Sequence, residues 1–112
     1  MERVNANDLE YRSGTSGPKY MFRGPNIDWG LIRFLPGENL GPHMHKEVEE
    51  TFYFHTGNGV FVVDDLQYDI RPGSAFRVEP GEVHDLTNTG NQPLEGIFIK
   101  HCYKPDDKVE MD

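Results

Sequence analysis

Histidines beside a β-prone stretch give this sequence its clearest chemical potential. His43 and His45 are separated by one residue. Because successive side chains of a strand point to opposite faces, these two imidazoles point the same way. Glu50 follows at the start of a β-prone run, residues 50–54. Imidazoles and a carboxylate that converge on one face are ligands that divalent transition metals accept. A third imidazole is available at His84, so the sequence predicts a metal site.

Glycines and prolines around these residues place them in two motifs. The first reads G-x5-H-x-H-x4-E-x6-G over residues 37–57, and the second reads G-x5-P-x-G-x2-H-x3-N over residues 73–88. Glu79 stands where this motif has its proline, but Pro80 follows it and keeps the turn rigid. These spacings resemble those of the cupin superfamily. The chain resembles a small single-domain cupin of the conserved-barrel type, related to oxalate decarboxylases.

The resemblance to cupins implies a fold and a ligand set. The implied fold is all-β, a small antiparallel jelly-roll barrel (a double-stranded β-helix) with a metal near its open end. The implied ligands of one divalent ion are three imidazoles and one carboxylate, those of His43, His45, Glu50 and His84. This ligand set does not distinguish Mn, Fe, Ni, Zn, Co or Cu. The six residues between Glu50 and Gly57 favour Glu50 over its neighbour Glu49.

A cation in an apolar stretch is a candidate for binding a substrate. Arg33 is the only cation in residues 27–35, which are apolar on both strand faces. In one interpretation Arg33 faces outward and pairs with one of the many acidic residues. In the other it faces the pocket and holds a carboxylate or phosphate through its planar pair of donors.

Aromatic residues and one further histidine, His101, complete the candidate pocket. Phe52 and Phe54 share the strand face of Glu50, so we expect them to form pocket walls, with plain core packing as the alternative. His101 is a further candidate for binding the substrate. His101 and Tyr53 are also candidates for proton transfer, but no catalytic residue is assigned. His55 lies on the opposite parity and is expected at the surface or an interface.

Short punctuated segments predict the fold class independently of any motif. Twelve glycines and eight prolines divide the 112 residues into about nine to eleven expected strands without a helical periodicity, as in an all-β sandwich or barrel. We predict one domain over residues 1–112. Residues 1–18 would be an N-terminal arm or edge strand, and residues 104–112 a loose, charged C-terminal tail.

An acidic composition narrows the partners. The chain has 19 acidic and 11 basic residues and a net charge of −8, which disfavours binding to nucleic acid or an anionic membrane. No stretch reaches the ~20 apolar residues of a membrane span, and the start of the chain has no secretory apolar region. With a single cysteine, Cys102, the expected location is the cytoplasm. The open edges of a short barrel predict a homodimer.

Two functions are compatible with these residues. The first is a metalloenzyme that acts on a small oxygen-rich acid or sugar-like anion, as a decarboxylase, dioxygenase, isomerase or lyase. The second is a non-catalytic, metal-dependent module that binds or senses a small anion. The sequence does not decide between them, because no general acid or base is evident beyond the ligands themselves.

Overall fold

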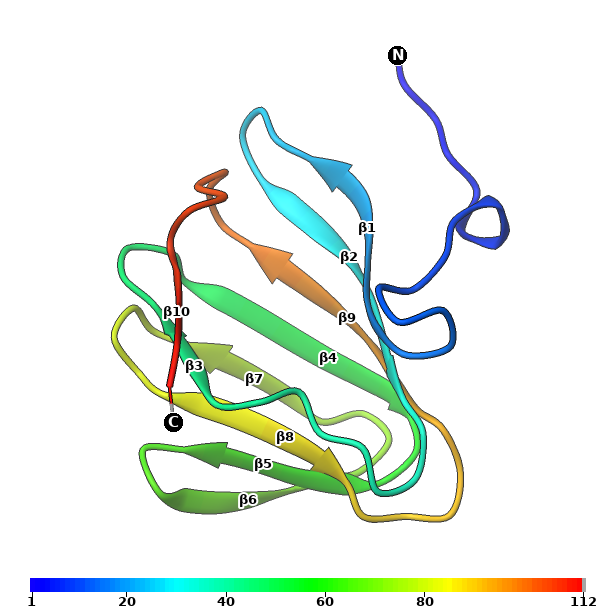
Figure 1. Ribbon diagram of the computed structural model, residues 1–112, viewed down its shortest axis with the longest axis vertical. Coiled ribbons are helices and arrows are strands. Elements are labelled where there is room, and N and C mark those ends of the chain that lie inside the picture. The colour runs from blue at the N-terminus through cyan, green and yellow to red at the C-terminus, as the bar shows by residue number, and fades with distance from the viewer. Residues whose placement is uncertain (112) are drawn as a thin grey trace.

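Two five-stranded antiparallel sheets enclose one core in the computed structural model, which describes residues 1–111 (Figure 1). The first sheet has the strand order β1 (Gly17–Arg23), β2 (Asp28–Phe34), β9 (Leu94–Lys100), β4 (Glu50–Thr56) and β7 (Ala75–Val78). The second has the order β10 (Lys108–Glu110), β3 (His43–His45), β8 (His84–Asn88), β5 (Gly59–Val63) and β6 (Leu66–Ile70). The prediction of an all-β jelly roll is confirmed. None of the helical structure in residues 1–111 has the length and apolar character needed to cross a membrane.

Strand alternation places the core between the two sheets. In β2 and β8 every second residue is buried, as the period of two in a strand requires. The side chains of Phe54, Phe61, Leu86 and Leu94 have no exposed surface. Burying an apolar side chain of this size contributes roughly 1.5–3 kcal/mol, so this cluster anchors the two sheets to each other.

One glycine sets how closely the neighbouring strands β9 and β4 of the first sheet approach each other. A Cβ atom at Gly96 of β9 would collide with the backbone carbonyl of Tyr53 in β4. Only glycine therefore fits at this position. The register of the same strand pair places Glu50 directly opposite Lys100.

Residues before β1 form an arm with little regular structure. It contains a single 3₁₀ turn, η1 (Ala6–Asp8), and a β-bridge between Tyr11 and Gly14. The buried Lys19 ties this arm to β1, since its Nζ donates a hydrogen bond to the carbonyl of Ala6 at 2.9 Å. Strand β1 begins at Gly17, inside the segment of residues 1–18 predicted as an arm or edge strand.

The prediction of a loose C-terminal tail is wrong for the residues that the structure describes. Strand β10 pairs with β3, and Lys108 lies opposite His45. The buried Asp107 accepts hydrogen bonds from the backbone N–H groups of Glu47 and Val48 at 3.0–3.1 Å. A charged sequence suggested a solvated segment, but strand pairing uses backbone groups and the backbone donors satisfy the carboxylate. Residue 112 of the predicted tail lies outside the described residues.

Candidate metal centre

Four side chains from three strands converge between the sheets. They are His43 and His45 of β3, Glu50 of β4 and His84 of β8, and one ligand atom from each lies within 4.8 Å of the others. All four residues are buried, with at most 4% of their surface exposed. Titratable side chains that are buried this close together need hydrogen-bond partners or a bound cation, because burying a polar or charged group without a partner costs free energy.

Local strand geometry explains how the four residues meet. His43 and His45 point inward because they alternate with Met44, as the sequence predicted. His84 is the register partner of His43 across the β3–β8 pair. The turn before β8 is fixed to the ligand strand, since the Gly81 N–H donates to the His45 carbonyl at 2.8 Å. Two backbone contacts therefore position the histidine ligands.

Hydrogen bonds at the outer ring nitrogens orient two of the imidazoles. Nδ1 of His43 lies 2.9 Å from the carbonyl oxygen of Gly41, and Nδ1 of His84 lies 3.1 Å from that of Glu82. A carbonyl only accepts, so Nδ1 carries a proton in both rings, and in a neutral ring Nε2 then keeps its lone pair. This arrangement behind an imidazole is common in metal sites, where it fixes the tautomer and the ring.

Nε2 of His84 provides a test of whether the cluster fits a metal. This atom is buried and makes no hydrogen bond within the described residues. It lies 3.4 Å from Oε1 of Glu50, so a ring lone pair faces a carboxylate oxygen. The contact of His45 with the same oxygen is shorter. Nε2 of His45 lies 3.1 Å from Oε1 of Glu50, within hydrogen-bonding distance. A cation among these atoms would satisfy His84 as well, and the residues therefore fit a metal ion.

Burial and mutual charge set the protonation of the cluster. Burial, followed by the charge of His84, lowers the pKa of His43 to about 4. Burial alone would raise the pKa of Glu50, but its interactions with His45 and His84 and the charge of Lys100 lower it to about 2. At neutral pH, His43 is neutral and Glu50 is ionised, which are the forms that bind a metal.

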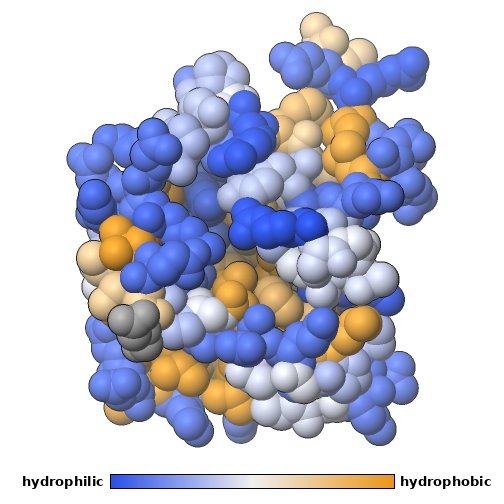
Figure 2. All heavy atoms as spheres, in the orientation of Figure 1, coloured by the Kyte–Doolittle hydropathy of each residue, from blue (hydrophilic) through white to orange (hydrophobic). Residues whose placement is uncertain are grey.

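A small cavity of about 40 Å³ opens onto three of these ligands. Apolar side chains form much of its wall. Figure 2 shows apolar residues between hydrophilic ones in the middle of the face that it draws. The polar lining of the cavity outside the ligands consists of Arg12, Tyr20, Lys100 and Lys108. The sequence analysis missed all four. The signal for Lys100 was present, because it follows Phe98 on the inward parity of β9.

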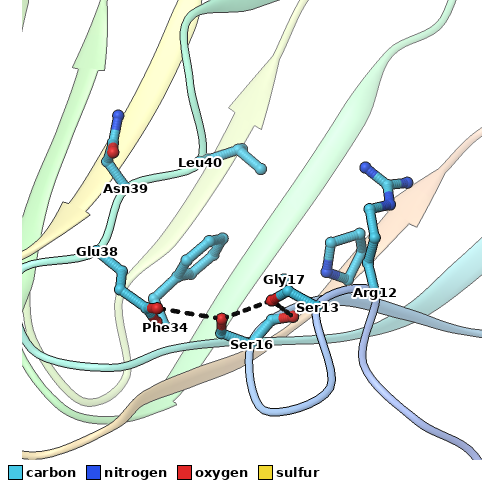
Figure 3. A pocket seen from close by; sticks show the side chains of 9 residues that line it. Arg12, Ser13, Ser16, Gly17, Phe34, Glu38, Asn39 and Leu40 are labelled. Atoms are coloured by element: carbon cyan, nitrogen blue, oxygen red, sulfur yellow. Dashed lines mark hydrogen bonds between the residues drawn. The ribbon is translucent and has the colours of Figure 1, made fainter.

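A larger hollow of about 320 Å³ adjoins the first and shares Arg12, Pro18 and Leu40 with it. Figure 3 shows Arg12 on one side of this hollow and Leu40 on the other. Ser16, in the N-terminal arm, donates a hydrogen bond of 3.3 Å to the carboxylate of Glu38, in the segment between β2 and β3. The arm therefore borders both cavities.

The four predicted substrate-binding residues, Arg33, Phe52, Phe54 and His101, lie in four different environments. Phe52 lines the metal cavity, and Phe54 lies deeper in the core. Arg33 alternates with the buried Ile32 and Phe34 of β2, so it faces away from the cavity. Its Nε atom is buried and has no hydrogen-bond partner in residues 1–111. Their roles in substrate binding remain predictions.

His101 lies at the exposed end of the first sheet. Its Nε2 lies 3.2 Å from Oγ1 of Thr51 and 3.4 Å from a carboxylate oxygen of Glu49. Glu49 is therefore engaged at the surface, while Glu50 belongs to the buried cluster. His55 is exposed, on the parity opposite to Phe54. The role of His101 toward a substrate also remains a prediction.

Comparisons with known proteins agree with this architecture. A family model described as "Cupin domain" matches residues 30–100. The chain is 37% identical over 68 residues, 61% of its length, to the oxalate-binding protein of Thermotoga maritima. It is 33% identical over 70 residues, 62% of its length, to dimethylsulfoniopropionate lyase DddW of Ruegeria pomeroyi. These matches cover 56% and 44% of the two relatives, so the chain spans about half of their lengths.

A solved structure extends the likeness to the whole chain. A Klebsiella pneumoniae protein with a double-stranded β-helix domain superposes with a TM-score of 0.84, covering 100% of this chain and 99% of that one. The sequence identity is 15%, so this likeness establishes the fold alone.

Proposed function

The chain belongs to the cupin domain family. We propose that it holds one divalent metal ion and that a small carboxylate binds at this metal. The proposed ligands are His43, His45, Glu50 and His84. The observation that carries the proposal is Nε2 of His84, which is buried, lacks a hydrogen-bond partner within the described residues and faces the Glu50 carboxylate. A divalent cation would satisfy both atoms.

The residues of the chain would assist such an ion in separate ways. A divalent ion supplies a Lewis acid that polarises a bound carboxylate or carbonyl group. The carbonyls of Gly41 and Glu82 hold two imidazoles in place. Ile32 and Phe52 form apolar walls that exclude water, which strengthens charge interactions in the cavity.

A small anion is the proposed ligand because of the size and charge of the cavity. One water occupies about 10–15 Å³ on the same scale as the 40 Å³ cavity, so only a molecule of few atoms fits. Three of the four polar residues outside the ligand set are cations, Arg12, Lys100 and Lys108. The relative in Thermotoga maritima is named an oxalate-binding protein, and oxalate is therefore our first probe.

A metalloenzyme that acts on a small oxygen-rich acid is the function we favour. Tyr20 and Lys100 both line the cavity, and a hydroxyl or an amine can hold or move protons during catalysis. The relative in Ruegeria pomeroyi is named a lyase. The reaction of this chain, whether decarboxylation, dioxygenation, isomerisation or elimination, would be determined by assay.

A non-catalytic binding module is the second candidate. The name of the Thermotoga maritima relative states binding and no turnover. The two candidates share the metal site and differ in whether the bound anion is consumed.

The test combines metal analysis with ligand-dependent stability. We expect purified protein to contain one equivalent of a divalent metal and oxalate to raise its Tm, because a ligand that binds only the folded state stabilises it. His84→Ala and chelator-treated protein should lose this shift. Loss of oxalate over time would identify an enzyme, and a shift without loss would identify a binding module. An equal shift after complete metal removal would contradict the proposal.

A further inference from the structure

Cations concentrate at the metal cavity although the chain as a whole is acidic. Its net charge is −8, yet Arg12, Lys100 and Lys108 line the cavity, and Glu50 is the only acidic residue among the described residues that line it. These cations come from the N-terminal arm, β9 and β10, which are different parts of the fold. Their convergence creates a local positive potential that attracts an anion.

Lys100 lies on β9, the strand next to β4, which carries the ligand Glu50. It lies directly opposite Glu50 in the register of β9 and β4, on the inward parity of Phe98. Its Nζ donates a hydrogen bond to the hydroxyl oxygen of Tyr20 at 2.7 Å. It also lies 5.3 Å from the centroid of the Tyr20 ring. Tyr20 thus holds the ammonium group beside the ligand cluster.

The other two cations differ from Lys100 in position or pairing. Lys108 is already paired, since its Nζ lies 3.2 Å from a carboxylate oxygen of Glu110. Arg12 stands at the border between the small cavity and the larger hollow (Figure 3). Lys100 forms no ion pair within residues 1–111, so its charge is available to a ligand.

Counting donors shows what the Lys100–Tyr20 pair recognises. An ammonium group has three N–H donors and no acceptor, and Tyr20 takes one of them. Because the Tyr20 oxygen accepts that bond, its own O–H is left to donate. The pair offers the cavity only donors, which suits a group with only acceptors, and a carboxylate is such a group.

We propose that Lys100, positioned by the Tyr20 hydroxyl, binds the second carboxylate of a small dicarboxylate whose first carboxylate lies at the metal ligands. The proposal rests on the proposed function and names the substrate class of that site. It makes Lys100 the residue that selects a dicarboxylate over a monocarboxylate, and Tyr20 its positioning residue.

The experiment measures oxalate and acetate binding to metal-loaded protein by calorimetry, with metal content determined for every variant. Lys100→Met preserves the stem length and removes the charge. Tyr20→Phe preserves the ring and removes the hydroxyl. We expect Lys100→Met to weaken oxalate binding by about tenfold to a hundredfold, and Tyr20→Phe to weaken it less. Acetate binding should weaken less than oxalate binding in both variants, because acetate lacks the second carboxylate, and metal content should stay near the wild-type value.

Lys104→Met is the matched control, because it removes the same charge at an exposed position outside the cavity. It should bind oxalate as the wild type does. Raising the salt concentration should reduce oxalate affinity more in the wild type than in Lys100→Met, since screening acts on the charge that this variant lacks.

Failure of this inference and failure of the proposed function give different results. If Lys100→Met or Tyr20→Phe keeps full metal and the wild-type preference for oxalate over acetate, the assignment of that residue is overturned while the metal site stands. If the wild-type protein binds no metal, or binds metal but no oxalate, both proposals are overturned. Should Lys100→Met fail to fold, Tyr20→Phe and Lys100→Gln decide the question through the same oxalate-to-acetate ratio.

Discussion

His43 and His84 are register partners across β3 and β8, and the centroids of their rings lie 4.2 Å apart. The backbone pairing of the two strands therefore brings two of the proposed ligands together before any metal is considered. Each ring is held from behind by a backbone carbonyl, at Gly41 and at Glu82. Such preorganisation reduces the ordering that a metal must impose when it binds.

We predict that His43→Ala, Glu50→Ala and His84→Ala each lose most of their bound metal, because each removes one of the four converging ligands. His55→Ala, at an exposed position, should keep a full equivalent. Elemental analysis of the purified variants is the measurement. Retention of metal by all three ligand variants would contradict the site. Loss of metal from Glu49→Ala with retention by Glu50→Ala would move the carboxylate ligand by one residue.

The stability of metal-free protein should fall as the pH is lowered from 6.5 to 4. The pKa of His43 is about 4 in the folded protein and about 6.5 in an unfolded chain. Between these values the unfolded chain binds a proton that the folded protein does not, so stability rises with pH across this window. The loss on reaching pH 4 is roughly 3 kcal/mol from this group.

Urea unfolding in the presence of a chelator, at a series of pH values from 7 to 4, measures this dependence. His43→Gln should show a shallower slope because glutamine does not titrate. The low pKa of Glu50 would extend the decline below pH 4.5, where an unfolded glutamate begins to bind its proton. A wild-type stability that stays constant from pH 7 to pH 4 would contradict the prediction.

Asp107 should stabilise the loop between the ligand strands. Its carboxylate accepts the N–H groups of Glu47 and Val48, which lie between His45 and Glu50. Hydrogen bonds to a charged group contribute about 1.5–3 kcal/mol each, so we expect Asp107→Ala to lower the free energy of unfolding by about 2 kcal/mol and to weaken metal binding.

The exposed neighbour Asp106 provides the matched control for Asp107. Asp106→Ala should change the free energy of unfolding by less than about 0.5 kcal/mol, as is usual for surface substitutions. Urea unfolding and metal titration measure both effects. Equal behaviour of the two alanine variants would show that the Asp107 hydrogen bonds do not hold the loop.

How much of the site could be predicted from sequence differs between its parts. Strand alternation places His43 and His45 on one face, and Glu50 and His84 joined them in the prediction through spacings that resemble those of cupins. Tyr20 escaped prediction because its contact with Lys100 joins residues 80 positions apart in the chain, and local spacing does not reveal such a pair.

The C-terminal strand shows a second limit of the sequence. Residues 104–111 are charged, and their composition resembles that of a solvated tail. Their order comes from pairing with β3 and from the buried Asp107. Both contacts join residues far apart in the chain, so local composition does not reveal them.

We predict that the protein is a homodimer that associates through the outer face of the first sheet. Trp29 and Ile97 lie on this face only half-buried, and Tyr53 is 44% exposed. Apolar side chains on an open sheet face favour burial against a second copy. Sedimentation equilibrium should give a dimer at micromolar concentration and a weaker one for Tyr53→Asp. Tyr68→Asp, on the edge strand β6, is the control. A monomeric wild type would overturn the prediction.

We predict that Arg33→Ala lowers oxalate affinity by a smaller factor than Lys100→Met. Arg33 faces away from the cavity, so it acts on an anion only through its field, which solvent and salt reduce. Calorimetric titration at low and high salt compares the two variants. An Arg33→Ala effect larger than that of Lys100→Met, with metal content intact, would show that Arg33 binds the anion directly.

Strand β3 lies between β8 and β10, both of which follow it much later in the chain. Folds dominated by such non-local pairings fold in milliseconds to seconds, because distant segments must find each other before they are stabilised. The ligand set is complete only when β3, β4 and β8 are all in place. An interaction that is absent from the folding transition state changes mainly the unfolding rate. Added metal should therefore slow unfolding strongly and leave the refolding rate nearly unchanged.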